Sequence, residues 1–297
     1  MRIGWQWLSV LALTACGRLG MDAAMERDPA LHSAAAGRRS APRNAAASTA
    51  PAPGCVVPEP VDAGCVPTQA PSNGAYPSGS LWLQMEDPDP AMGIHVDDSH
   101  GARCSGRRCP APVAGVHGNG FLFSGQQVQI EWAPDLDGSA GYTVGVWARL
   151  DAYPQGTLDH SFACALAKPN SSGRLGNGES YALCVNSSHL VYDYTTSDSE
   201  SHMLVGQGAR AEIAELGRWH HLAATWDATC RTKTLYVDGC RVNASVADVG
   251  FDRSPVVVGS DTTSPSSWSG ALDDVLIYDR ALGDADIKQL VAGTASL

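Results

Sequence analysis

The chain has 297 residues and a formal net charge of −11 at pH 7. The acidic excess lies in residues 77–297, which hold 14 basic and 26 acidic side chains, whereas residues 17–76 hold five of each. Because nucleic-acid binders carry a basic face, this composition argues against a nucleic-acid partner and suits solubility, calcium or neutral sugars.

The first 15 residues are predicted to be an export signal. After Arg2, the run IGWQWLSVLALTA (Ile3–Ala15) is apolar over thirteen residues, which fits the roughly 7–15 residues of a signal-peptide core. The run is too short for a membrane-spanning helix, which needs about 20 residues.

Leu13-Thr14-Ala15-Cys16 resembles the lipobox of bacterial lipoproteins, in which the cysteine is lipidated and becomes the new N-terminus. The resemblance implies that Cys16 anchors the chain to a membrane, because two or more lipid chains hold a protein where a single one is marginal. Gly17 stands where retention in the inner membrane usually requires aspartate, so the resemblance also implies the outer membrane of a Gram-negative cell. An ordinary signal peptide with an unrelated cysteine is the alternative.

Residues 16–75 are predicted to form a flexible tether between the signal (1–15) and a folded domain (76–297). The run ALHSAAAGRRSAPRNAAASTAPAPG (Ala30–Gly54) consists almost entirely of small residues, proline and arginine. Such a segment buries too little apolar surface to offset the loss of backbone entropy on folding.

Residues 76–297 are predicted to form an all-β domain. Short apolar or alternating runs recur between clusters of Gly, Asn, Asp, Ser and Pro, which is typical of a sandwich or barrel. Within YTVGVWARL the alternation puts Val144 and Val146 on one face and Trp147 on the other. We expect strands in the following runs, with one helix at ADIKQLV: SLWLQM, GFLFSG, QVQIEW, YTVGVWARL, SFACALA, SYALCV, HLVYDYT, WHHLAATW, TLYVDG, PVVVGS and ALDDVLIYD.

Five segments of this domain resemble laminin-G-like, concanavalin A-type jelly rolls. GRWHHLAATWD and KTLYVDGCRV match the central hairpins of that family, and WSGALDDVLIYDRALGDADIKQL matches its closing strand and helix. VAGVHGNGFLFSG and GYTVGVWARL match its opening strands. The segments cover roughly residues 80–292 in the order of the family. The resemblance implies a two-sheet antiparallel jelly-roll sandwich.

The resemblance also implies a calcium ion. Family members often hold one with acidic side chains and carbonyl oxygens near the junction of the first and last strands, and such hard oxygen ligands suit calcium. The matching positions are Glu86 or Asp87 after the first predicted strand, Asp98 in DDSHG, and Asp273 in ALDDVLIYD. The histidine of DDSHG departs from the usual Asp-Ser-Ser-Gly. Solvated acidic side chains without a metal are the alternative.

Three functions are open to such a domain: recognition of a glycan or of an envelope or extracellular protein, polysaccharide hydrolysis, and spacing without a ligand. Hydrolysis requires two carboxylates that flank the glycosidic bond, and laminarinase-type enzymes of this fold carry them as Glu-x-Asp-x-x-Glu or a close variant. The nearest approach, AEIAEL with Glu212 and Glu215, lacks the intervening acid. We therefore predict non-catalytic recognition, with a structural spacer as the alternative and a hydrolase as the third reading.

Two histidines and one tryptophan are of residue types that can contact a ligand. His220 and His221 are neighbours in a predicted strand, so they point to opposite faces and cannot bind one metal together. The resemblance places this WHH segment in the scaffold of the fold. Trp268, in the loop DTTSPSSWSG, is the candidate ligand contact, and core packing is its alternative.

An exported location permits disulfides, and eight of the nine cysteines pair off by proximity. Cys164 and Cys184 lie in two runs predicted to pair as antiparallel strands, which brings their Cα atoms within the ~4.4–6.8 Å that a disulfide requires. Cys230 and Cys240 flank a predicted strand that holds them well over ~7 Å apart unless the turns at both ends fold back, so their connectivity stays open. The pairs by proximity are Cys55/Cys65, Cys104/Cys109, Cys164/Cys184 and Cys230/Cys240.

Overall fold

The computed structural model divides the chain into two compact units, Met1–Asn44 and Ala45–Leu297. All the residues that it describes belong to the second unit. They are residues 50–59, 65, 81–86, 88–89, 93–94, 100–105, 109–155, 162–171, 178–197, 201–261 and 267–292.

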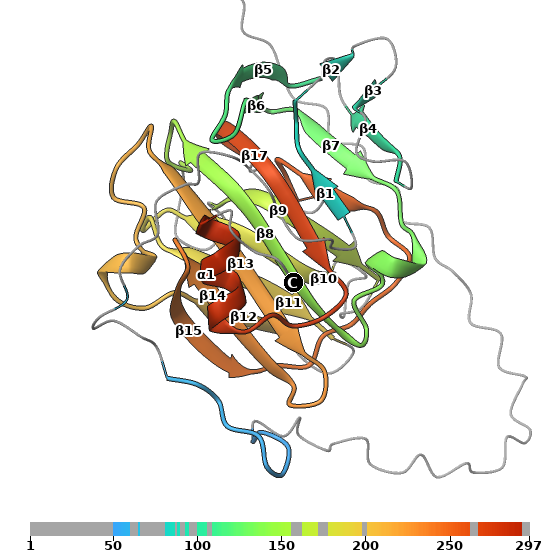
Figure 1. Cartoon of the computed structure of the whole chain (residues 1–297), viewed down its shortest axis with the longest axis vertical. Helices are drawn as coiled ribbons and strands as arrows, with labels where there is room; N and C mark the ends of the chain where they lie inside the picture. The colour runs from blue at the N-terminus through green and yellow to red at the C-terminus, as the bar shows by residue number, and fades with distance from the viewer. Residues whose placement is uncertain are drawn as a thin grey trace, which may run out of the picture. The chain divides into compact units, whose positions relative to one another are not determined.

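The larger of two main sheets has eight strands, all of whose pairings are antiparallel (Figure 1). Its centre is formed by two ten-residue strands, β8 and β17, and the short strand β1 pairs with β17 beyond the main path. In spatial order the strands are β15 (Cys240–Val246), β14 (Thr232–Val237), β13 (Trp219–Asp227), β8 (Gly141–Leu150), β17 (Ser269–Tyr278), β6 (Asn119–Ser124) and β5 (Ala111–Ala114), with β1 (Leu81–Leu83) beside β17.

The second main sheet has seven antiparallel strands. In spatial order these are β12 (Ser201–Val205), β11 (Val191–Thr196), β10 (Gly178–Asn186), β9 (Phe162–Asn170), β16 (Val256–Val258), β7 (Gln127–Ile130) and β4 (Ala102–Ser105). The remaining elements are the hairpin β2 (Pro88–Asp89) and β3 (Gly93–Ile94), the 3-10 turns η1 (Pro134–Leu136) and η2 (Ala209–Ala211), and helix α1 (Asp284–Ala292). The predicted all-β, two-sheet antiparallel sandwich is confirmed.

The core lies between the two sheets and is built from the alternation seen in the sequence. Val144 and Val146 of β8 point inward to the main hydrophobic cluster, as do Leu166 of β9 and Leu183 of β10 in the facing sheet. Burying both sets of side chains removes apolar surface from water at roughly 25 cal/mol per Å², which is the main force that holds the sheets together.

Helix α1 covers the outer face of the eight-stranded sheet, and Figure 1 shows it lying over β13 and β14. Ile287 and Leu290 of the helix pack against Tyr236 of β14 and Tyr278 of β17. This cover explains why β14 and β17 are buried on both faces. Within the described residues, no helix has the length and apolar character needed to cross a membrane.

Two of the pairings by proximity are confirmed. Cys104 bonds to Cys109, and Cys164 bonds to Cys184 across the β9–β10 pair, with Cα atoms 5.1 and 4.0 Å apart. Cys164 and Cys184 are direct partners in the antiparallel register, as predicted.

The pairing of Cys55 with Cys65 is wrong, and Cys230 and Cys240, whose connectivity the sequence left open, do not pair with each other. The structure joins Cys55 to Cys230 and Cys65 to Cys240, with Cα atoms 5.4 and 5.9 Å apart. Strand β14 separates Cys230 from Cys240, so each bonds to a partner outside the hairpin. Both bonds span 175 residues. The two spans are equal because Cys55 and Cys65 are ten residues apart, as are Cys230 and Cys240.

These two bonds attach the segment that precedes the sandwich to the turn between β13 and β14 and to β15. The backbone carbonyl of Glu59 also accepts a hydrogen bond from Arg241 Nε at 2.8 Å. Because Cys55 is covalently joined to the domain, the tether expected over residues 16–75 can be a free segment no further than residue 54.

Candidate functional site

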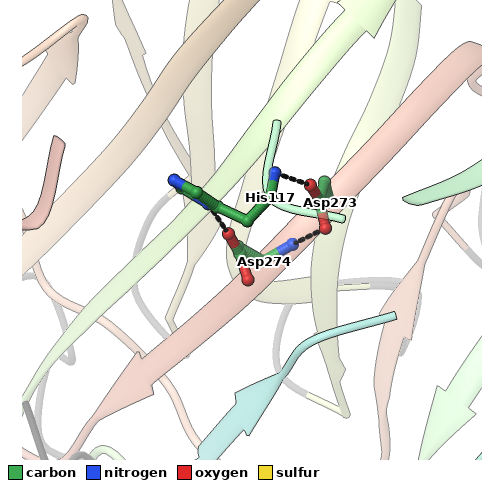
Figure 2. A group of neighbouring side chains, drawn as sticks. All are labelled: His117, Asp273 and Asp274. Atoms are coloured by element: carbon green, nitrogen blue, oxygen red, sulfur yellow. Dashed lines mark hydrogen bonds and ion pairs between the residues drawn. The ribbon is translucent and has the colours of Figure 1, made fainter. Parts of the chain in front are cut away.

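One buried carboxylate holds the turn between β5 and β6 (Figure 2). Asp273 lies in β17 and is 0% exposed. Its Oδ2 accepts hydrogen bonds from the backbone N–H groups of Val116 at 2.7 Å and His117 at 3.1 Å, and its Oδ1 accepts one from Asp274 at 2.8 Å. Asp273 therefore fixes the turn to the closing strand.

The turn, GVHG at residues 115–118, needs glycine at both ends. A Cβ atom at Gly115 would lie 2.4 Å from Asp273 Oδ2, and one at Gly118 would lie 2.3 Å from the carboxylate of Glu86. Gly118 also has a φ of +62°, a left-handed conformation that glycine adopts without steric cost. The two glycines allow two carboxylates to approach the turn closely.

Glu86 is the second carboxylate at this turn. Its Oε2 accepts a hydrogen bond from the backbone N–H of Asn119 at 2.9 Å, and its backbone carbonyl accepts one from Asn119 Nδ2 at 3.1 Å. Unlike Asp273, Glu86 is exposed to solvent.

Asp274 turns toward the same region because β17 is irregular there. The register with β8 shifts between Asp273 and Leu276, and Asp274 has a φ of +47°. Such a bulge re-aims a side chain that a regular strand would point the other way. The Asp274 carboxylate accepts a hydrogen bond from Trp82 Nε1 at 2.8 Å and pairs with the His117 ring, which faces it in Figure 2.

The environment of Asp273 favours its protonated form. Its pKa is raised from 3.8 to about 7, chiefly by burial and then by the neighbouring Asp274 carboxylate. The hydrogen bonds from backbone N–H groups act in the opposite direction, because they stabilise the ionised form.

Within the described ranges, one group of three metal-binding side chains is compact enough to share an ion. The ligand atoms of His117, Asp273 and Asp274 all lie within 4.8 Å of one another. Calcium takes six to eight oxygen ligands, whereas this group includes a nitrogen donor and carboxylates that already accept N–H groups. The group as it stands fits calcium poorly.

The predicted calcium ligands are brought together only in part. Glu86 and Asp273 both contact the turn, but Glu86 is not a member of the compact group. Asp87 and Asp98 lie outside the described residues, as does the proposed lipidation site, Cys16. A calcium ion held by Glu86, Asp98 and Asp273 therefore stays a prediction.

Trp268 is a core residue, so its assignment as a ligand contact is wrong. Its side chain is 0% exposed and belongs to the cluster between the sheets. Its indole Nε1 donates a hydrogen bond to the carbonyl of Arg149 at 3.2 Å. An indole buried in this way cannot stack on a sugar, and the alternative of core packing is correct.

His220 and His221 have separate partners, as expected from their opposite faces. His220 Nδ1 lies 2.9 Å from Asp238 Oδ2. His221 is 0% exposed and packs edge-on against Trp147, with ring centroids 5.3 Å apart. Burial lowers the pKa of His221 to about 4, so it is neutral at physiological pH.

Sequence reasoning missed a buried acid in β10. Glu179 is 2% exposed, and neither carboxylate oxygen has a hydrogen-bond partner among the described residues. Burial, and then the charge of Asp261, raise the pKa of Glu179 from 4.5 to about 8. Nothing in the run GESYALCV distinguishes this glutamate from a solvated one, because its burial depends on the tertiary fold.

Comparisons with known proteins agree with this fold. A laminin G-type family model, described as the concanavalin A-like lectin/glucanases superfamily, matches residues 123–288, which is more than half of the chain. No curated protein matches the sequence.

Among solved structures, the chain is similar to Trypanosoma rangeli sialidase in complex with the inhibitor DANA, with a TM-score of 0.52 and 16% identity. That match covers 71% of this chain and 32% of the sialidase, so the chain spans about a third of that protein. Domain 4 of AbnA, a GH43 extracellular arabinanase from Geobacillus stearothermophilus, in complex with arabinotriose, matches with a TM-score of 0.52 and 12% identity over 72% of this chain and 98% of that domain. At these identities the likeness concerns the fold.

Proposed function

The chain belongs to the concanavalin A-like lectin/glucanases superfamily, and from that premise we propose that it is a non-catalytic recognition module that binds a glycan. We propose further that a lipid on Cys16 holds it at the outer membrane of a Gram-negative bacterium, with the segment that precedes Cys55 as its stalk. The four disulfides point to an oxidising, exported location.

The role of the acidic side chains at the candidate site is the observation that favours recognition over catalysis. Asp273 and Glu86 accept hydrogen bonds from backbone N–H groups and so fix the shape of a turn. Turns held on a rigid sandwich are where binding residues of such folds are placed. The arabinanase domain supports the choice of ligand, since that domain, which this chain matches over 98% of its length, is in complex with arabinotriose.

A hydrolase is the second candidate, and Glu179 is the observation that favours it. A carboxyl whose pKa is raised to about 8 remains protonated at neutral pH, as a general acid must be. Asp261, whose negative charge contributes to the raised pKa of Glu179, is also buried. At 2% exposure, however, Glu179 is closed to a polysaccharide, so we rank hydrolysis below recognition.

Binding can be measured by titrating the detergent-solubilised full chain with arabinotriose and with an array of neutral and sialylated oligosaccharides. We expect at least one glycan class to bind without release of shorter products. The same titration with added calcium and with a chelator tests the predicted ion, because calcium-dependent binding would be lost with the chelator.

Two glycine variants test whether the turn at residues 115–118 takes part in glycan binding. Gly118→Ala is expected to weaken glycan binding, because a Cβ atom there meets the Glu86 carboxylate. Gly101→Ala is the matched control, since no atom lies within 4 Å of its added Cβ. A folded wild-type chain that binds no glycan would favour a structural spacer, and release of shortened oligosaccharides would favour a hydrolase.

The lipid anchor is tested separately by Cys16→Ser. We expect this variant to remain unlipidated, because serine lacks the thiol that accepts the lipid, and to move from the detergent phase to the aqueous phase in a partition assay. Thr14→Ser, which keeps a small residue in the LTAC segment, should stay in the detergent phase. Retention of Cys16→Ser in the detergent phase would contradict the anchor.

A further inference from the structure

A lysine and an aspartate meet inside the sandwich, one from each sheet. Lys233 lies in β14 of the eight-stranded sheet, and Asp193 lies in β11 of the seven-stranded sheet. Lys233 Nζ is 2.9 Å from Asp193 Oδ2, and both side chains are 0% exposed. Neither of these two atoms has another hydrogen-bond partner among the described residues.

The surroundings of the pair are apolar and aromatic. Tyr142 and Tyr181 are buried in the same core, with ring centroids 5.0 Å apart, and neither hydroxyl has a hydrogen-bond partner among the described residues. The pKa of each tyrosine is raised by burial and then by the charge of Asp193. The remaining oxygen of the carboxylate, Asp193 Oδ1, accepts a hydrogen bond from the N–H of Ala182 at 2.9 Å.

Burial disfavours the charged forms of both partners. It raises the pKa of Asp193 and lowers that of Lys233, and their mutual attraction opposes both effects. A buried ion pair recovers its desolvation cost only with good geometry and further hydrogen bonds, which the ammonium of Lys233 lacks among the described residues. Transfer of one proton from Lys233 to Asp193 gives a free amine beside a carboxylic acid, which are a nucleophile and its electrophile.

We propose that Lys233 and Asp193 condense to form an isopeptide bond that joins the two sheets. The lone pair of Lys233 Nζ attacks Asp193 Cγ, and a new C–N bond forms. The bond from Cγ to the acid hydroxyl breaks, and the hydroxyl leaves with one amine proton as water. The products are a secondary amide and one water molecule, and the reaction needs no oxidant, cofactor or second protein.

The close approach of the two groups, with Lys233 Nζ 2.9 Å from Asp193 Oδ2, would accelerate this step. Groups held about 3–3.5 Å apart in a productive orientation react as though at effective concentrations of ~10⁵–10⁸ M, because their translational and rotational entropy is already lost. The product replaces two buried charges with one neutral amide, which removes the cost of keeping an ion pair out of water.

A peptide map of the full chain tests the proposal. After reduction, alkylation and digestion with trypsin, an isopeptide would link the peptide 175–210, which contains Asp193, to the peptide 232–241, which contains Lys233. Trypsin would not cleave after Lys233, and the branched product would weigh one water molecule less than the sum of the two peptides. Cleavage after Lys233, giving the peptides 232–233 and 234–241 together with 175–210 at its full linear mass, would overturn the proposal.

Lys233→Arg is the matched control. Arginine keeps a cation opposite Asp193, but its guanidinium remains protonated and is not a nucleophile under these conditions. We expect this variant to give separate linear peptides. Fragmentation of the wild-type branched peptide should place the link at Lys233 and Asp193, and a link between any other two residues would also overturn the assignment.

Discussion

Removal of both Cys55–Cys230 and Cys65–Cys240 is expected to lower the free energy of unfolding by about 8 kcal/mol, whereas removal of either one alone costs about 3 kcal/mol. Each bond by itself closes a loop of 175 residues. When one bond is already present, the other closes only a short ring, which runs through residues 55–65 and 230–240. The full entropy of the long loop is released only when both are gone. Because single domains are stable by only about 5–15 kcal/mol, the double variant should be close to unfolding at room temperature.

Equilibrium unfolding in urea under non-reducing conditions measures these differences, with each cysteine pair replaced by alanine. The control is removal of Cys104–Cys109, which spans five residues and should cost about 2 kcal/mol. If the double variant lost no more free energy of unfolding than one of the single variants, the long-loop argument would be wrong.

Glu179→Gln is expected to stabilise the protein at pH 8 and to leave its stability nearly unchanged at pH 4.5. The folded-state pKa of Glu179, about 8, lies above the unfolded value near 4.5, so the folded protein keeps a proton that the unfolded chain releases. Stability therefore falls as the pH rises from about 4.5 to 8, and the neutral amide removes that loss. We expect the difference between variant and wild type at pH 8 to be about 2–4 kcal/mol, after allowance for the buried amide.

The comparison must be made between variant and wild type at each pH, because other groups titrate in the same range. Asp273, whose pKa is raised to about 7, adds a slope of the same sign, and His221, whose pKa is lowered to about 4, adds one of opposite sign. Glu215→Gln is the control, since Glu215 is exposed. A stability difference for Glu179→Gln that does not change with pH would show that Glu179 is ionised in the folded protein.

The fold could be predicted from the sequence because the residues that specify each strand lie close together along the chain. Alternating runs such as YTVGVWARL, bounded by turn residues, specify strands and the face that each strand buries, and the order of five segments specifies the sandwich. The Cys164–Cys184 bond was predictable for the same reason, since its cysteines lie in neighbouring strands of a hairpin.

The site was less predictable because its contacts join distant parts of the chain. Asp273 was identified, but its role in holding Val116 and His117 depends on a contact across 157 residues. Asp274 reaches the same turn through a bulge, and no pattern in ALDDVLIYD reveals a residue with positive φ. Trp268 lies in a stretch that reads as a loop, and its burial follows from the tertiary structure.

The wrong cysteine pairings have the same cause. Proximity along the chain is a good guide when two cysteines face each other across a hairpin, but Cys230 precedes strand β14 and Cys240 follows it. The equal ten-residue spacing of 55/65 and 230/240 is the signal that could have suggested two side-by-side segments joined at both ends.

These paired bonds also decide how the domain responds to mechanical force. A pull applied to the chain upstream of Cys55 passes through the Cys55–Cys230 bond directly to the turn between β13 and β14. Strand β1, which is held by only three residue pairs to β17, lies outside this path and carries no tension. The domain can therefore be stretched from its N-terminal side without peeling its first strand from the sheet, and its resistance to extension is set by covalent bonds and by the β14 pairings.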